Sequence, residues 1–251
     1  MKQLLYNGEV ELVFDEEKHR YFVNGRQVKG VTSILKVIAK PALVPWAVKC
    51  TVDALREEWK PGEAYDEIEI EEMLKESKFA YRRVSGKACT IGDLVHTWIE
   101  HEIKGEKNKS YVNPEVKNAI TQFKNWKDGH DIEFLASEKK VYSRKYDYAG
   151  TFDGLFKVNK ASDLKKGVYL FDIKTSKAIY PEYWLQLAAY RQALLEEDKK
   201  LKLVGHALVR CGKDGQFEIQ TSEDNQALKI DQEGFMGALK LSEWENAQGK
   251  K

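Results

Sequence analysis

Two short segments of the chain carry acidic and basic residues at spacings that could bind a cation and hydrolyse an ester. They are residues 150–156 (GTFDGLF) and 169–175 (YLFDIKT), which a polar segment joins. Both resemble β-strands because they are rich in aromatic and β-branched residues. In a hairpin that turns midway between them, Asp153 lies opposite Asp172, because paired positions keep a constant sum. The sequence thus predicts two carboxylates facing each other.

Lys174 completes the polar face of the second strand. Side chains alternate along a strand, so Asp172 and Lys174 share one face, while Phe171 and Ile173 point to the other. Facing carboxylates repel unless a cation screens them, and oxygen ligands suit Mg²⁺ or Mn²⁺. With a lysine that stabilises developing negative charge, this arrangement predicts phosphodiester hydrolysis. The alternative is two solvent-facing carboxylates and an ordinary surface ion pair with Lys174.

The elements around these strands predict an α/β protein. Strands are expected at residues 134–143, 150–158, 167–175, 204–210 and 216–221. Helices are expected at residues 90–104, where Thr90 would cap the start and Gly105 would end the helix, at 114–128, at 181–197 and at the C-terminus.

The N-terminal part is expected to be an elaboration of this core. Residues 10–28 alternate around an Asn-Gly pair, which predicts a β-hairpin. Residues 32–59 have helical spacing interrupted by two prolines, which predicts two helices and a bend. The acidic stretch 63–76 is interpreted as a solvated helix face and loop without a site. We therefore expect an elaboration over residues 1–89, packed on a core of residues 90–251.

Bulk composition excludes several classes of protein. The 251 residues carry 41 Lys plus Arg and 40 Asp plus Glu, so any contact with nucleic acid must come from local patches. Cys50, Cys89 and Cys211 lack the number and spacing of a disulfide framework or zinc site. No apolar run is long enough for a bilayer and the N-terminus turns acidic, which predicts a soluble cytoplasmic protein without a membrane partner.

Four motifs in a fixed order resemble the RecB-like branch of the PD-(D/E)xK nucleases. They are GDLVH (92–96), GTFDG (150–154), FDIKT (171–175) and QLAAY (186–190), and the resemblance covers residues 92–195. It implies a restriction-endonuclease-like α/β fold, in which a central mixed sheet is flanked by helices. It also implies that Asp153 and Asp172 bind a divalent metal and that Lys174 is catalytic.

The resemblance implies further site residues. His96 would be another metal ligand or a neighbour of the metal; the alternative is a packing histidine. Glu138 would lie at the edge of the metal site, with Glu133 as the competing acidic residue. Gln186 and Tyr190 would organise the site or contact DNA, and their i, i+4 spacing places them on one helix face. Their alternative role is packing of a buried tyrosine with a glutamine at its margin.

The activity that the resemblance implies is a DNA exonuclease that trims single-stranded or duplex ends in processing, recombination or repair. Mg²⁺ would be the cofactor, with Mn²⁺ able to substitute. A structure-specific or restriction-like endonuclease and a catalytically silent DNA-binding or assembly protein remain alternatives. The cysteines predict no iron–sulfur cluster, and the lack of a glycine-rich phosphate loop predicts no nucleotide cofactor. A recombination or single-strand-binding protein is a candidate partner, and the oligomeric state stays open.

Candidate DNA contacts lie near the predicted strands. Basic residues precede Asp153 and could neutralise phosphates, although a solvated strand end explains them equally well: Lys139, Lys140, Arg144 and Lys145. Three aromatic residues could stack on unpaired bases or belong to the core: Tyr146, Tyr148 and Trp184.

Overall fold

The computed structural model describes residues 2–249, which form two compact units. The first unit combines residues 2–38 with residues 95–249, and the second comprises Ala39–Leu94. The helix that carries the chain from the second unit back to the first is α4, Ala80–Lys104. The boundary expected between residues 89 and 90 falls inside this helix.

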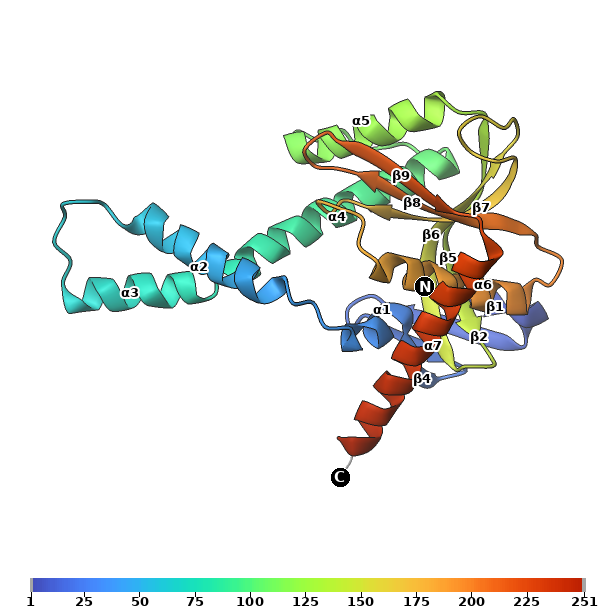
Figure 1. Ribbon diagram of the computed structural model, residues 1–251, viewed down its shortest axis with the longest axis horizontal. Coiled ribbons are helices and arrows are strands. Elements are labelled where there is room, and N and C mark those ends of the chain that lie inside the picture. The colour runs from blue at the N-terminus through green and yellow to red at the C-terminus, as the bar shows by residue number, and fades with distance from the viewer. Residues whose placement is uncertain (1, 250–251) are drawn as a thin grey trace. The chain divides into compact units, whose positions relative to one another are not determined.

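A nine-stranded mixed sheet is the centre of the first unit (Figure 1). Its order is β1-β2-β3-β4-β6-β7-β8-β9, and β5 pairs with β6 outside this path. β4 with β6 and β7 with β8 are parallel, and the other pairs are antiparallel. The strands are β1 Lys2–Leu5, β2 Val10–Asp15, β3 Arg20–Val23, β4 Arg26–Gly30, β5 Ile132–Ser143, β6 Tyr148–Val158, β7 Gly167–Lys174, β8 Leu203–Cys211 and β9 Phe217–Ser222.

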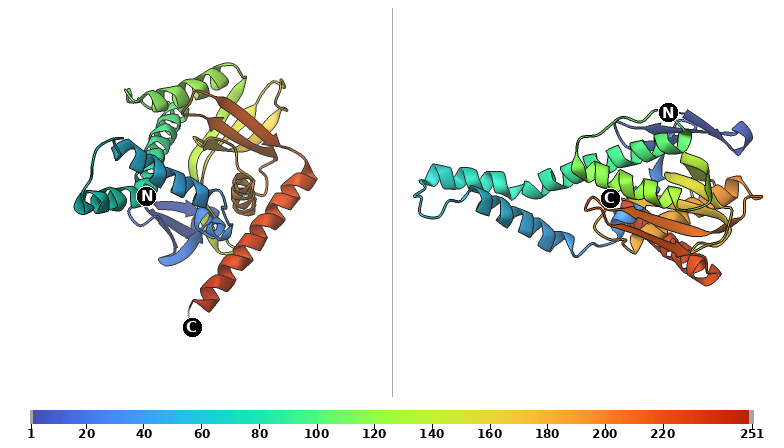
Figure 2. Two further views of the ribbon diagram at one scale, coloured as in Figure 1. Left: turned by 60° about the vertical axis from the view of Figure 1, so that its left-hand side comes forward. Right: turned by 90° about the horizontal axis from the view of Figure 1, so that it is seen from above.

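Helices cover both faces of this sheet (Figure 2). The helical elements of the first unit are η1 Tyr6–Gly8, α1 Val31–Ile34, η2 Leu35–Val37, α5 Pro114–Asp128, α6 Glu182–Glu197 and α7 Asn225–Gln248, with the C-terminal part of α4. The predicted mixed sheet flanked by helices is therefore confirmed. No helix within residues 2–249 is long and apolar enough to cross a bilayer.

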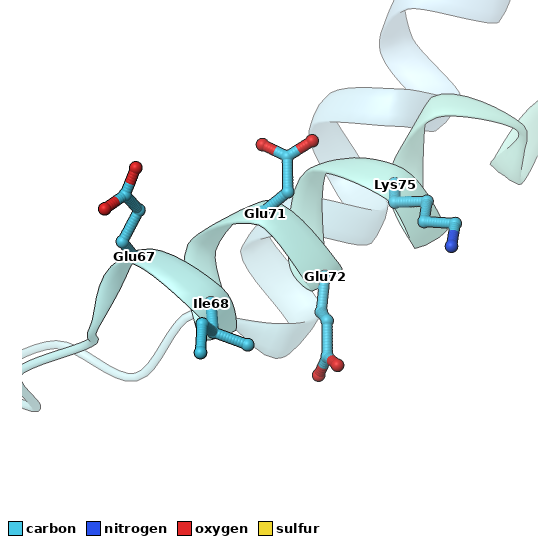
Figure 3. A pocket seen from close by; sticks show the side chains of 5 residues that line it. All are labelled: Glu67, Ile68, Glu71, Glu72 and Lys75. Carbon is cyan, nitrogen blue, oxygen red and sulfur yellow. The ribbon is translucent and has the colours of Figure 1, made fainter.

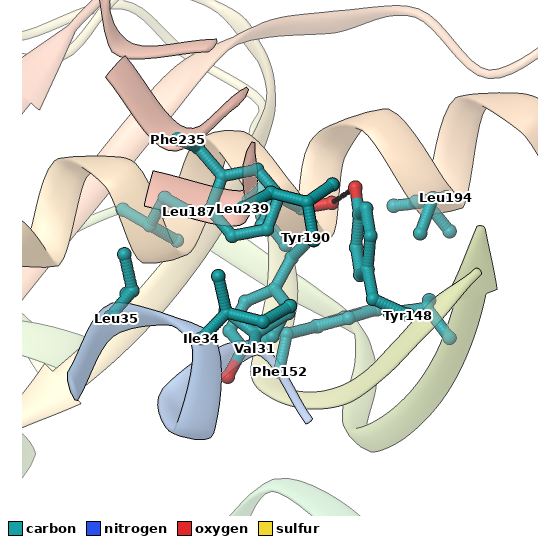
Figure 4. Close-up of a cluster of buried hydrophobic side chains, with 14 of the residues drawn as sticks. Val31, Ile34, Leu35, Tyr148, Phe152, Leu187, Tyr190, Leu194, Phe235 and Leu239 are labelled. Atoms are coloured by element: carbon teal, nitrogen blue, oxygen red, sulfur yellow. Dashed lines mark hydrogen bonds between the residues drawn. The ribbon is translucent and has the colours of Figure 1, made fainter. Parts of the chain in front are cut away.

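Two apolar clusters fix the sheet between its helices. One cluster joins α1, α6 and α7 to the central strands through side chains such as Phe152, Leu187 and Phe235 (Figure 4). Within it, the Tyr148 hydroxyl donates a 2.8 Å hydrogen bond to the backbone oxygen of Ala189, which ties α6 to β6. On the opposite face, aromatic rings of α5 and the strands pack with centroids 5.4–6.5 Å apart: Trp126, Phe134, Phe156 and Phe171.

The N-terminal segment follows the predicted pattern and extends it. β2, β3 and β4 form an antiparallel meander, and β1 adds a fourth strand that the sequence did not suggest. Asn24 and Gly25 turn between β3 and β4 with φ values of 47° and 78°, the left-handed geometry that this pair favours. The meander joins the main sheet through the short parallel pairing of β4 with β6.

The second unit is helical. It contains α2, Leu43–Glu58, and α3, Glu67–Lys78, together with the N-terminal part of α4. The expected two helices and bend over residues 32–59 correspond to α1 with η2 and to α2. The acidic stretch forms α3, which starts with a capping box between Asp66 and Glu69. A shallow hollow along α3 is lined by Glu67, Ile68, Glu71, Glu72 and Lys75 (Figure 3).

The predicted helix start at Thr90 is wrong. α4 begins ten residues earlier, at Ala80, and continues to Lys104, where Gly105 ends it with a φ of 69°. Thr90 is interior, and its hydroxyl donates a 3.1 Å hydrogen bond to the backbone oxygen of Gly86. A threonine that bonds to the preceding turn does not need to cap a helix, so the residue type alone gave no boundary here.

Candidate active site

The register of β6 and β7 brings Asp153 and Asp172 to neighbouring positions. Gly154 pairs with Phe171, and Leu155 pairs with Leu170, which is the constant-sum register predicted from the sequence. Asp153 and Asp172 are the next positions along this register. Both side chains are buried, with exposed fractions of 9% and 2% for the residues. The carboxylates therefore lie where water screens their charges poorly.

Glu138 adds a third carboxylate on the other side of β6. The pairing of β5 with β6 shifts by one residue between Phe134 and Ala136. Beyond the shift, Ser137 pairs with Gly154 and Lys139 with Phe152, so Glu138 is level with Asp153. Glu138 has a φ of 48°, unusual for a residue with a side chain. Three neighbouring strands thus place one carboxylate each at the same level of the sheet.

The other acidic candidate on β5, Glu133, lies elsewhere. It pairs with Lys157 in the ladder and forms a 3.8 Å ion pair with it on the exposed surface. The structure therefore brings Glu138, and not Glu133, to the cluster with Asp153.

Asp153 is held by contacts on both of its oxygens. Its Oδ2 accepts a 2.5 Å hydrogen bond from the backbone N–H of Ile173. Its Oδ1 lies 3.4 Å from Nδ1 of His96, which α4 contributes from one face of the sheet. The β-strand and the helix thus fix Asp153 between them, and His96 belongs to this cluster as the motif suggested.

Lys174 is held by an equally specific set of partners. Its Nζ forms an ion pair with Oδ2 of Asp172 and donates a 3.0 Å hydrogen bond to Oε1 of Gln186. Nε2 of Gln186 in turn donates a 2.9 Å hydrogen bond to the Tyr190 hydroxyl. Tyr183 presents its ring to the ammonium, with Nζ 4.3 Å from the ring centroid. α6 therefore fixes the position of the ammonium.

Burial and mutual repulsion change the pKa values of the acids. Burial raises the pKa of Glu138 to about 8, and the Asp153 charge adds to the rise, although His96 opposes it. Burial likewise raises the pKa of Asp172 to about 6, partly offset by Lys174. The pKa of Asp153 is lowered, because attraction to His96 and Lys174 outweighs its burial. If all three acids were ionised, they would carry one negative charge more than His96 and Lys174 neutralise, so Glu138 keeps its proton at neutral pH.

The two basic groups respond in the opposite sense. Burial alone would lower the pKa of His96, but the charge of Asp153 outweighs it and raises the pKa to about 9. The pKa of Lys174 is also raised, since Asp172 and Asp153 outweigh the effect of burial. Both groups are therefore protonated at neutral pH when no cation is bound, and a bound cation would compete with the proton on His96.

His96, Glu138 and Asp153 can offer a metal ion one ligand atom each. These three atoms lie within 4.8 Å of one another, as the ligands of a single ion do. Two carboxylate oxygens and an imidazole nitrogen fit Mn²⁺ and Mg²⁺, with the nitrogen favouring a transition metal. Asp172 is outside this group, and its carboxylate is paired with Lys174.

Two tyrosines of the site were not anticipated. The Tyr21 hydroxyl is 2.9 Å from Oγ1 of Thr151, and the Glu138 charge adds to burial in raising the Tyr21 pKa. No local pattern links Tyr21 to residues so distant in sequence. Tyr183 could have been identified from the sequence, because it lies three residues before Gln186 and seven before Tyr190, on the same helix face.

The predicted DNA contacts are mostly engaged within the protein. Lys139 lies 3.9 Å from Glu197, and Arg144 makes a 2.7 Å ion pair with Glu9. Lys140 is 8% exposed, and the Lys145 ammonium lies over the ring of Tyr146. Tyr148 is fully buried, and Trp184 packs against the core cluster. Tyr148 therefore belongs to the core and is inaccessible to a base.

Comparisons with known proteins add little to this geometry. No protein-family model matches the chain, and no curated protein does. Among solved structures, the chain is similar to a "Putative exonuclease" from Eubacterium rectale, at 13% identity and a TM-score of 0.38, over 62% of this chain and 68% of the other.

Proposed function

We propose that this protein is a metal-dependent deoxyribonuclease with its active site at Asp153, Asp172 and Lys174. The observation that carries the proposal is the alignment of Glu138, Asp153 and Asp172 on three adjacent strands. A group of three buried acids attracts a divalent cation, and such a cation can catalyse the hydrolysis of a phosphodiester. The order of motifs in the sequence, which resembles the RecB-like nucleases, agrees with this chemistry.

The roles of the residues follow from their contacts. His96, Glu138 and Asp153 would hold the cation, and the Ile173 N–H keeps Asp153 oriented toward it. A bound Mg²⁺ or Mn²⁺ would polarise a phosphoryl oxygen and lower the pKa of an attacking water. Asp172 is the buried counter-ion that keeps Lys174 protonated.

Lys174 supplies the positive charge that stabilises the phosphorane-like transition state. The Lys174 ammonium is already in position to stabilise the negative charge that develops on the phosphoryl oxygens. A donor in a fixed position stabilises this charge more effectively than one that must reorganise. Gln186 fixes the ammonium from α6, and Tyr190 fixes Gln186. The same contacts make Gln186 and Tyr190 positioning residues in this mechanism.

The reaction we propose is exonucleolytic, because the RecB-like nucleases that the motifs resemble trim DNA ends. DNA with single-stranded or duplex ends is the proposed substrate, in processing, recombination or repair. An endonuclease would use the same carboxylates and lysine, so the two reactions differ in substrate access alone. Covalently closed circles separate them, since an end-dependent enzyme leaves circles intact.

The decisive experiment is a time course on 5′-labelled and 3′-labelled single strands, blunt duplexes and circles, with Mg²⁺ or Mn²⁺. The wild-type protein should cut linear DNA, and a chelator should stop it. Asp172→Ala should reduce the rate of cleavage at least about 100-fold, because Lys174 loses its counter-ion and the site loses a carboxylate. Glu133→Gln, which changes an exposed acid of β5, is the matched control and should cut normally.

Two results would contradict the proposal. The first is cleavage that persists in Asp172→Ala or in excess chelator, which would assign the activity to another site or a contaminant. The second is tight DNA binding without turnover at any divalent cation concentration, which would indicate a DNA-binding or assembly protein.

A further inference from the structure

An aromatic pair at the start of α6 extends from the lysine of the site to solvent. The Lys174 ammonium lies over the ring of Tyr183, with Nζ 4.3 Å from the ring centroid. Tyr180 meets Tyr183 edge to face, with centroids 5.6 Å apart and planes at 77°. Tyr183 is packed against the core, whereas Tyr180 is 43% exposed. The outer tyrosine is thus braced by a ring that contacts the proposed catalytic residue.

This placement suits a nucleobase next to the scissile phosphate. Nζ of Lys174 is 4.3 Å from the Tyr183 centroid, and the centroids of Tyr183 and Tyr180 are 5.6 Å apart, so a phosphate at Lys174 would bring a neighbouring base close to this pair. Every base has a π-face, so an exposed aromatic ring stacks on it with little regard to sequence. Lys177 is exposed and lies between Lys174 and Tyr180 in the sequence, so it adds positive charge to this segment. Aromatic rings combined with basic residues are the usual means of binding single strands.

We propose that Tyr180, braced by Tyr183, stacks on an unpaired base of the DNA strand being cut, and that it makes the site selective for single-stranded or frayed ends. In a duplex, the faces of an internal base are covered by its neighbours. A base that stacks on Tyr180 must therefore be terminal or unstacked. This inference rests on the proposed function for the position of the phosphate at Lys174.

The test measures binding separately from cleavage. Fluorescence anisotropy of a labelled 12-nucleotide single strand is recorded with Ca²⁺ in place of Mg²⁺, for the wild type, Tyr180→Ala and Tyr180→Phe. The same titrations are repeated with oligonucleotides that carry one abasic position each. Trp244→Ala removes another exposed aromatic side chain, on α7, and is the control. Thermal unfolding checks that each variant is folded.

The expected result is a coupling between Tyr180 and one base. Tyr180→Ala should weaken binding about 5- to 100-fold, and Tyr180→Phe should bind within about twofold of the wild type. One abasic position should cost the wild type a similar factor, and that cost should vanish in Tyr180→Ala. A blunt duplex should depend on Tyr180 less than the single strand does, because only its terminal base pairs have a free face.

Other outcomes overturn the inference. It fails if the wild type does not bind the single strand, if Tyr180→Ala binds as the wild type does, or if Tyr180→Ala loses the same factor on intact and abasic strands. Failure of the proposed function looks different: the coupling to one base would persist, but Mg²⁺ or Mn²⁺ would give no cleavage. Cleavage without the coupling would refute the role of Tyr180 alone.

Discussion

Replacing Glu138 with glutamine should stabilise the metal-free protein while weakening its response to divalent cations. Glu138 is partly buried and level with Asp153 on the adjacent strand. Burial, helped by the charge of Asp153, raises its pKa from 4.5 to about 8. At pH 7 the unfolded chain carries this carboxylate ionised, whereas the folded protein must take up a proton. Glutamine keeps the shape of the side chain and removes that cost.

The magnitude and its pH dependence follow from the two pKa values. Because the pKa of Glu138 is higher in the folded protein, its contribution to the free energy of unfolding is fully present below pH 4.5 and is lost as the pH rises toward 8. The advantage of Glu138→Gln should therefore be near zero at pH 4.5, increase with pH and level off above pH 8. At pH 7 it is at most about 3 kcal/mol, and partial exposure of the side chain reduces it further.

Urea denaturation between pH 5 and pH 8 in chelator measures this difference. Glu133→Gln removes an exposed acid from the same strand and should change the free energy of unfolding by less than about 0.5 kcal/mol. Added Mn²⁺ should raise the unfolding temperature of the wild type more than that of Glu138→Gln, because a cation that binds the folded state stabilises it. A Glu138→Gln protein that is less stable than the wild type at pH 8, or a gain that does not change with pH, would refute the repulsion described for the cluster.

Three further predictions concern His206, His96 and Gln186. Burial lowers the pKa of His206 from 6.5 to about 3, so the stability that its neutral imidazole contributes above pH 6.5 is lost as the pH falls. Urea denaturation should show that the free energy of unfolding drops by about 2 kcal/mol between pH 7.5 and pH 5, relative to His206→Leu. His96→Asn should raise the Mn²⁺ concentration needed for half-maximal cleavage at least about tenfold. The change for Mg²⁺ should be smaller, because Mg²⁺ prefers oxygen ligands. Equal changes for both ions would argue against a nitrogen ligand. Gln186→Leu should lower kcat about 10- to 100-fold at nearly constant KM, because Lys174 loses its hydrogen bond to Gln186. Steady-state kinetics that show a change in KM alone would contradict this prediction.

The hairpin of β6 and β7 shows what the sequence could predict. Its register depends only on where the chain turns, and the alternation of Phe171 with Asp172 identifies the core face without reference to the rest of the fold. Phe171 indeed joins the aromatic cluster, and Asp172 lies with Lys174 on the opposite side. The positions of both residues were predictable because the information is local.

The resemblance favoured Glu138 over Glu133, but the position of Glu138 depends on one irregularity in β5 that the pattern of the strand does not indicate. Pairs before the register shift, such as Phe134 with Phe156, would place Ser137 level with Asp153 if they continued. The extra residue moves Glu138 into that position. A β-bulge leaves no dependable trace in composition or periodicity, although it redirects every side chain that follows it.

This irregularity also bears on whether the acidic cluster is incidental. Glu138 combines a positive φ with a raised pKa beside a second carboxylate, and both features are unfavourable. A serine at position 138 would relieve the repulsion, and glycine would relieve the strained backbone as well. The apolar cluster that packs the central strands against α1, α6 and α7 stabilises the fold and can offset such costs. These costs are concentrated beside His96 and Lys174, and a cation held by His96, Glu138 and Asp153 would reduce them.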